Sequence, residues 1–167
     1  MRFSKLLIAL VALPLSLPLW AQGSLVTFKF LAPDVALEIA RAALQSCRDE
    51  GYQVSVAVVD RMGVTQVMLR DRFAGAHTPQ TAERMAATAV SFREDTLTIA
   101  ENTTSNSSLS GARFIEGTVM LGGGIPVSAS GFIVAGVGVS GGPSGEANHA
   151  CAQAGIDAVM DELELEG

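Results

Sequence analysis

The chain has 167 residues, 49% of them hydrophobic, and a formal net charge of −6. This length is typical of one domain that is large enough to build its own hydrophobic core. The 17 acidic residues outnumber the 11 lysines and arginines, and the basic residues form no cluster. Because nucleic-acid-binding proteins usually carry a basic face, the composition argues against a nucleic-acid partner.

Residues 1–21 have the pattern of a secretory signal peptide. Arg2 and Lys5 come first, an apolar run follows over residues 6–19, and Leu19-Trp20-Ala21 offers a small-residue cleavage signal. We therefore expect an exported protein that is cleaved at the end of this segment and is periplasmic or secreted.

A membrane anchor is the alternative for this segment. Pro14 and Pro18 interrupt the apolar run, which is shorter than the roughly 20 residues that a spanning helix needs. We therefore expect residues 22–167 to form the single mature domain, with no membrane span after cleavage.

The only two cysteines are Cys47 and Cys151. An even pair without C-x-x-C spacing in an exported protein favours a disulfide over a metal site or a catalytic thiol. Such a bridge would close a loop of about a hundred residues, for which the lost chain entropy corresponds to roughly 4–5 kcal/mol. Two buried, unpaired thiols are the alternative.

The first part of the mature chain predicts an edge strand, a helix and a hairpin. Residues 25–30 alternate as L-V-T-F-K-F, and residues 34–50 place apolar side chains on one helical stripe that ends before Gly51. Residues 53–59 and 64–70 are strand-like on either side of a turn signal, D-R-M-G, which is typical of a β-hairpin.

The middle of the chain predicts helices and a loop. Thr78 followed by Pro79 is typical of a helix N-cap, so residues 81–92 should be helical. Residues 94–101 can extend as a further helix, and residues 101–113 are polar and typical of a mobile loop.

The last part predicts three strands, over residues 118–121, 125–130 and 131–139, and a closing helix over residues 146–161. Neighbouring strands are joined by short turns rather than by crossover helices. The element order therefore predicts an α+β fold, a single domain with one antiparallel sheet of about five strands and flanking helices.

The letters G-x-G-x-x-G at residues 136–141 match part of a dinucleotide-binding fingerprint. That fingerprint requires a second parallel strand about twenty residues on, but only ELELEG follows Asp161. We therefore interpret Gly136 and Gly138 as strand glycines against which another backbone or helix packs closely.

Five separated motifs resemble a known family. They are VSVAVVDRMGV (54–64), Arg70-Asp71, AGAHTPQTAERMAATAVSF (74–92), GGGIPV (122–127) and GVGVSGGPSGEANHACAQAGIDAV (136–159). In this order they resemble the GlcG/HbpS family of haem-binding proteins and are similar to the C-terminal domain of PduO-type corrinoid adenosyltransferases. The resemblance implies a profilin-like fold, homo-oligomers, and haem as a cofactor, with roles in haem or iron sensing or handling.

A haem site needs an axial ligand, an apolar slot and cations for the propionates. His77, in the loop before Thr78, is the first candidate for the iron, with Arg70 and Arg72 as candidate cations for the propionates. A surface histidine beside a helix end is the alternative for His77. His149, in the first turn of the predicted last helix, is the second candidate ligand.

Other polar residues have simpler interpretations. Asp60 and Asp71 are expected to be turn and surface acids, although paired carboxylates could also hold iron, and the methionines are expected to fill the core. No nucleophile, base and acid set is recognisable, so haem degradation follows from the resemblance alone. The rival hypothesis is an oligomeric accessory module that binds a small molecule other than haem, in organic-acid or alcohol metabolism.

Overall fold

The computed structural model describes residues 24–165. The predicted signal peptide, residues 1–21, lies outside this range, as do residues 22–23 and 166–167.

The centre of the domain is a four-stranded antiparallel sheet in the order β2-β1-β4-β3. The two hairpins join β1 (Ser55–Asp60) to β2 (Thr65–Arg70) and β3 (Gly124–Ala129) to β4 (Phe132–Ser140). Pairing of β1 with β4 merges them into one sheet. The α+β class, the single antiparallel sheet and both hairpins are therefore as predicted.

The expected count of about five strands is too high. Residues 25–30 are exposed and belong to no strand, and residues 118–121 form none either. In the second segment the backbone N–H of Val119 donates to the hydroxyl of Thr88, 3.0 Å away, so a helix side chain satisfies it. Alternation of apolar residues shows that two faces differ, but a strand also needs a partner for its backbone.

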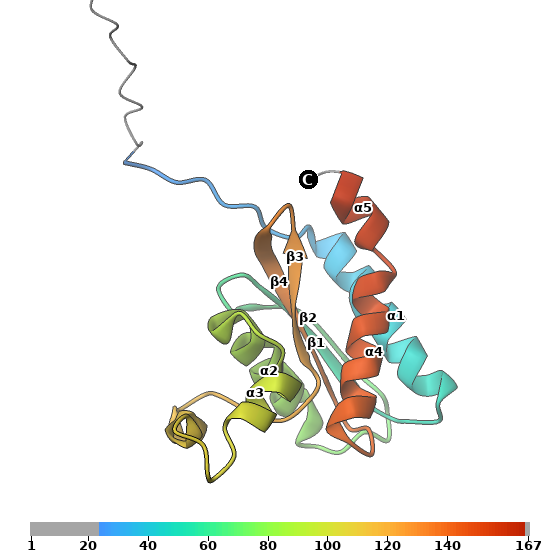
Figure 1. The fold of residues 1–167 in the computed structure, drawn as a ribbon. Helices are drawn as coiled ribbons and strands as arrows, with labels where there is room; N and C mark the ends of the chain where they lie inside the picture. The colour runs from blue at the N-terminus through green and yellow to red at the C-terminus, as the bar shows by residue number, and fades with distance from the viewer. Residues whose placement is uncertain (1–23, 166–167) are drawn as a thin grey trace, which may run out of the picture.

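Helices cover both faces of the sheet (Figure 1). The helices α1 (Pro33–Asp49) and α4 (Gly145–Asp157) lie side by side on one face, and α2 (Thr78–Phe92) crosses the other. Val54, directly before β1, shares a face with Val56 and Val58 of this strand, and all three lie in the core with residues of α1 and α4, as expected. Ser55, Ala57 and Val59 are buried too, so β1 is covered on both faces.

Glycines allow α2 to lie directly on the sheet. A Cβ atom at Gly138 would collide with the carbonyl oxygen of Ala82, and one at Gly124 would collide with that of Met85. A Cβ at Gly136 would lie 2.5 Å from a methyl of Val90. The G-x-G-x-x-G letters thus mark a close helix–sheet approach, which confirms the interpretation as strand glycines.

Three shorter helices complete the chain: α3 (Thr96–Asn102), the 3-10 helix η1 (Ser110–Phe114) and α5 (Met160–Leu165). The predicted mobile loop therefore contains a helical turn, and the predicted closing helix is divided between Asp157 and Met160. Among the helices of residues 24–165, none has the length and apolar character required to cross a membrane.

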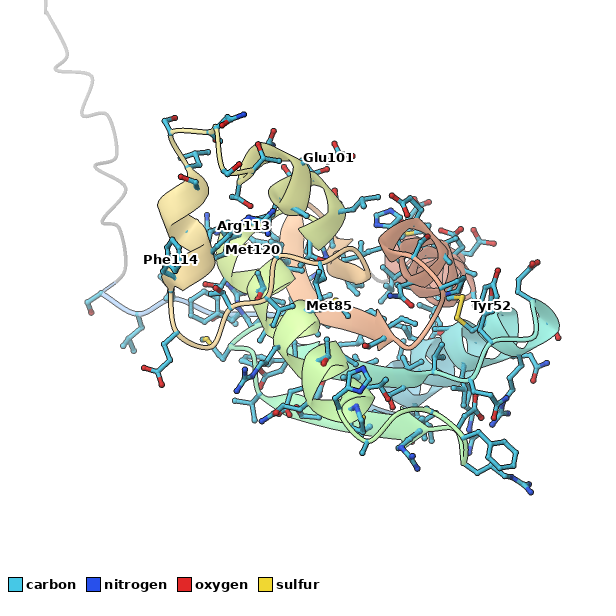
Figure 2. All side chains as sticks on the ribbon, turned by 90° about the horizontal axis from the view of Figure 1, so that it is seen from below. Tyr52, Met85, Glu101, Arg113, Phe114 and Met120 are labelled. Carbon is cyan, nitrogen blue, oxygen red and sulfur yellow. A yellow bond between two sulfur atoms is a disulfide. The ribbon has the colours of Figure 1, made fainter. Side chains whose placement is uncertain are left out.

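A disulfide joins Cys47 of α1 to Cys151 of α4, with both cysteines buried and their Cα atoms 5.4 Å apart. The next turn packs beside it, because the N–H of Tyr52 donates to the carbonyl of Cys47 at 2.9 Å (Figure 2). The bridge expected from the sequence is thus present, and it fastens together the two helices of one layer.

Candidate functional site

The structure places His77 just before α2, which begins three residues before the predicted range of 81–92. His77 rather than Thr78 occupies the N-cap position, although its side chain makes no capping hydrogen bond. The hydroxyl of Thr78 donates to the carbonyl of Gly75 at 2.8 Å and pairs with the hydroxyl of Ser55 at 2.7 Å. Thr78 therefore ties the loop to β1 instead of capping the helix.

Arg70 is the last residue of β2, Arg72 and His77 lie in the loop that follows it, and all three are exposed. The guanidinium of Arg70 donates to the carbonyl of Ala74, and that of Arg72 lies 5.8 Å from the centre of the Phe73 ring. The end of β2 and this loop thus present an imidazole, an aromatic ring and two cations on an exposed surface.

Asp71, in the same loop, is not the surface acid that the sequence suggested. Its side chain is only 5% exposed, and it accepts a hydrogen bond of 2.8 Å from Nε of Arg48 in α1. This bond raises the pKa of Arg48 above its ordinary value, although burial acts in the opposite direction. The ion pair anchors the start of the loop that carries His77.

His149 lies elsewhere, in α4, where its Nδ1 is 3.8 Å from Oδ1 of Asp95. This nitrogen is buried and has no hydrogen-bond partner. Asp95 is the N-cap of α3 and accepts hydrogen bonds of 2.8 Å from the backbone N–H and the hydroxyl of Thr98. His149 thus belongs to a contact between two helices and does not share the loop of His77.

The surroundings of Asp95 lower the pKa of its carboxyl group. Burial by itself would raise its pKa, but the two hydrogen bonds from Thr98 and the nearby His149 outweigh that effect. The pKa of Asp95 is therefore lowered from its ordinary value, and the charged cap is favoured in the folded state.

A hollow of about 950 Å³ lies on the α2 side of the sheet and contains none of the four predicted site residues. This volume is in the range of sites that bind small molecules and cofactors. Its walls come from the β1–β2 turn, the second half of α2, the segment after η1, the β3–β4 turn and the N-terminal arm. The residues lining it are Phe28, Arg61, Met62, Gly63, Ala87, Thr88, Val90, Ser91, Arg93, Glu116, Gly117, Thr118, Gly131, Phe132 and Ile133.

Arg61 is one of three charged residues that line this hollow, together with Arg93 and Glu116. Its guanidinium carbon lies 4.0 Å from the centre of the Phe28 ring, a cation–π contact. Its Nη1 is buried and has no hydrogen-bond partner. A buried N–H donor without an acceptor is costly, so Arg61 is a point at which a ligand with an oxygen acceptor would be stabilised.

A second cation comes from the end of α2. Arg93 ends this helix in the left-handed conformation, with φ of 58°, and its N–H donates to the carbonyl of Ala89. The hollow therefore combines two arginines with apolar groups, among them Met62 and Phe132, which are 61% and 59% exposed. Apolar walls with a few placed cations suit a flat apolar ligand that carries carboxylates.

The segment after η1 closes the remaining side and is held by Arg113. The side chain of Arg113 donates to the carbonyls of Thr103 and Ala100, at 2.5 Å and 2.7 Å, and so fastens η1 to the end of α3. Figure 2 shows Arg113, Phe114 and Met120 grouped at the end of the molecule away from Tyr52. Glu116 and Thr118 continue from this group into the hollow.

Arg61, Arg93 and Phe28 are site residues that no sequence motif indicated. The D-R-M-G stretch was interpreted only as a turn, which is correct for Asp60: its carboxylate accepts hydrogen bonds from the N–H groups of Met62 and Val64 at 2.7 Å and 3.0 Å. No local signal shows that this turn meets the end of α2. Within residues 24–165 no three acidic, histidine or cysteine side chains gather as a metal site.

Comparison with known proteins agrees with the resemblance seen in the sequence. Residues 31–157 match the family model described as "Haem degrading protein HbpS-like". No curated protein sequence matches significantly.

Solved structures of this family are similar over most of the chain. A double mutant of HbpS from Streptomyces reticuli is 39% identical with a TM-score of 0.77, over 87% of this chain and 99% of that one. Klebsiella pneumoniae ORFY is 25% identical with a TM-score of 0.79, over 83% and 96% of the two chains. PduOC, solved as a haem complex, is 27% identical with a TM-score of 0.72, over 77% and 94%. The chain therefore belongs to the HbpS-like family.

Proposed function

We propose that this protein binds haem in the hollow beside α2. The observation that carries the proposal is the combination in one hollow of about 950 Å³ of apolar walls, two arginines and a guanidinium nitrogen without a partner. Membership of the HbpS-like family and the similarity to PduOC, which was solved with haem, support the choice of ligand.

The residues of the hollow fit the parts of a haem. Its porphyrin is flat and apolar and suits the side chains of Phe28, Met62 and Phe132, while its two propionates suit Arg61 and Arg93. When bound, the haem would supply a redox-active iron, and the chain would supply orientation, partial exclusion of water and charge compensation.

Two kinds of side chain, an imidazole and a thioether, are candidates for the iron ligand. His77, the ligand predicted from the sequence, precedes α2, whereas the hollow lies against the second half of this helix, about 16 Å along it from His77 to Thr88. Met62 lies in the hollow and offers a thioether, which is a known axial ligand. His77 would reach a haem in the hollow only from another copy in a homo-oligomer.

Titration of the mature protein with haemin tests the proposal. We expect a shifted Soret band with a one-to-one endpoint per chain. The iron ligand is identified by three variants, His77→Ala, His149→Ala and Met62→Leu, because loss of the ligand changes the Soret and visible bands. The matched control for Met62→Leu is Met68→Leu, which lies on β2 outside the hollow. Absence of any Soret shift in the wild type would refute haem binding.

Two arginines in a hollow also suit an organic acid, which keeps the non-haem accessory module as the second candidate. Protein purified after haem-supplemented expression and examined by native mass spectrometry separates the two. A co-purified haem mass supports the first function, and a bound small acid without haem supports the second. The same spectra give the number of copies in the proposed homo-oligomer.

We also propose that the protein is exported to the periplasm or beyond. The signal-peptide pattern of residues 1–21 supports this, and so does the disulfide, since disulfides persist in oxidising compartments. Cell fractionation with N-terminal sequencing of the product is the test. A product that stays in the cytoplasm and retains residues 1–21 would contradict it.

A further inference from the structure

Arg61 has a feature that the general fit to haem does not use, namely one buried guanidinium nitrogen that lacks an acceptor. We propose that Arg61 is the residue that selects ligands with a free carboxylate, by donating from this nitrogen to one propionate oxygen. The inference rests on the proposed function and goes beyond it, because it assigns recognition of the ligand's charge to one side chain.

The turn that carries Arg61 holds it in a defined place. The N–H of Asp60 donates to the carbonyl of Val64 at 2.8 Å, and the N–H of Gly63 donates to the carbonyl of Asp60 at 2.9 Å. Gly63 has φ of 83°, a conformation that favours glycine. It also lies next to α2, since a Cβ at this position would be 3.5 Å from the methyl of Ala87. These two hydrogen bonds hold the backbone at Arg61 in place before any ligand binds.

The acids closest to this arginine in the chain and in the hollow do not satisfy it. The Asp60 carboxylate is engaged by the two N–H groups of its own turn. Glu116 lines the same hollow but forms no ion pair with Arg61. The ion pairs found among residues 24–165 are those of Arg48 with Asp71 and of His149 with Asp95. The guanidinium of Arg61 can therefore pair with a carboxylate of a bound ligand.

The contact with Phe28 orients the guanidinium without satisfying it. An aromatic face attracts a cation but accepts no strong hydrogen bond from Nη1. The guanidinium is therefore positioned while one donor stays unpaired, which lowers the entropy lost when a carboxylate binds. An arginine that served only to support the fold would be expected to have its buried donors paired.

The test compares haemin with haemin dimethyl ester, in which both propionates have lost their charge. We expect the wild type to bind haemin about 10- to 100-fold more tightly than the ester, which is the range that a charged hydrogen bond provides. Arg61→Met should lose most of this preference by weakening haemin binding while leaving ester binding nearly unchanged. Arg61→Lys, which keeps the charge but not the fork of donors, should fall between them.

Arg41→Met, on α1 at the opposite face of the sheet, is the matched control and should keep the full preference. Thermal unfolding of the ligand-free variants supplies a second measurement, since a structural arginine would lower the melting temperature when replaced. We expect Arg61→Met and Arg41→Met to have similar melting temperatures, because removal of the Arg61 guanidinium leaves no buried acceptor without its hydrogen bond.

The outcomes separate the inference from the proposed function. If the wild type binds haemin and Arg61→Met retains the preference over the ester, the role of Arg61 is refuted and haem binding stands. If the wild type binds no haemin, the proposed function fails and this inference fails with it. Loss of the preference in Arg61→Met but not in Arg41→Met supports the assignment.

Discussion

Gly138 is a residue whose importance lies in the side chain that it lacks. A Cβ at this position would meet the backbone carbonyl of Ala82 in α2, which cannot move aside as a flexible side chain would. Paired with it across the β3–β4 ladder is Gly124, which faces the carbonyl of Met85 in the same way. These two glycines determine how closely the helix lies on the sheet, and hence where the hollow at its far end opens.

We expect Gly138→Ala to lower the free energy of unfolding by about 1–3 kcal/mol, because the added methyl overpacks a helix–sheet contact. Urea denaturation measures the change. Gly111→Ala is the control, since a Cβ at Gly111 meets no atom within 4 Å. Equal stability of the two variants would contradict the close approach of α2.

The Arg48–Asp71 pair makes a second prediction at this scale. Arg48→Met leaves the Asp71 carboxylate, 5% exposed, without its main partner, so we expect a loss of about 1–3 kcal/mol in unfolding free energy. Arg41→Met on the same helix is the control, with little expected change. Chemical denaturation that shows the same stability for both variants would mean that the pair does not hold the loop.

At the scale of elements, α3 depends on its N-cap, Asp95. This helix has seven residues, too few to be stable alone, and Asp95 satisfies the N–H of Thr98 at its start. The helix leads through η1 to Glu116 and Thr118 in the wall of the hollow. The Asp95 cap therefore stabilises a helix that helps to position one wall of the hollow without lining the hollow itself.

We expect Asp95→Ala to cost about 1 kcal/mol at neutral pH, as for other lost N-caps. The contribution should also depend on pH. Because the pKa of Asp95 is lower in the folded state, the unfolded chain binds more protons in the window between the two pKa values. The stabilisation is complete above the unfolded value, about 3.9, and is lost as the pH falls through the folded one.

Asp95→Asn separates charge from capping, since an amide oxygen can still accept from Thr98. Urea denaturation at a series of pH values should show the wild type more stable than Asp95→Asn at pH 7, with the difference closing at acid pH. A difference that does not change with pH would show that the charge of Asp95 adds nothing.

At the scale of the whole molecule, the disulfide joins residues 104 positions apart and so links the first helix to the fourth. Removing it in the double variant Cys47→Ala/Cys151→Ala should lower the free energy of unfolding by about 2–5 kcal/mol, because the unfolded chain gains freedom. Reduced wild-type protein is the companion sample and should match the double variant in urea denaturation. Unchanged stability in both would rule out the bridge as a stabilising link.

Local patterns were sufficient for most elements of the fold. The stripe before Gly51, the D-R-M-G turn between β-branched runs and the proline after Thr78 each depend on interactions within a few residues, and α1, the first hairpin and α2 follow from them. The strands expected at residues 25–30 and 118–121 failed for the opposite reason. A strand requires a partner from elsewhere in the chain, and no local pattern names one.

The sequence by itself determined the α+β class, the family resemblance, the interpretation of Gly136 and Gly138 as strand glycines and the expected disulfide, because each depends on composition, order or local spacing. Only the tertiary structure decided that Arg61, Arg93 and Phe28, from three separate segments, line one hollow, and that His77 and His149 belong to different surroundings. The physical reason is that a site is made by long-range packing, here of α2 on a row of glycines, which brings together residues that no local period connects.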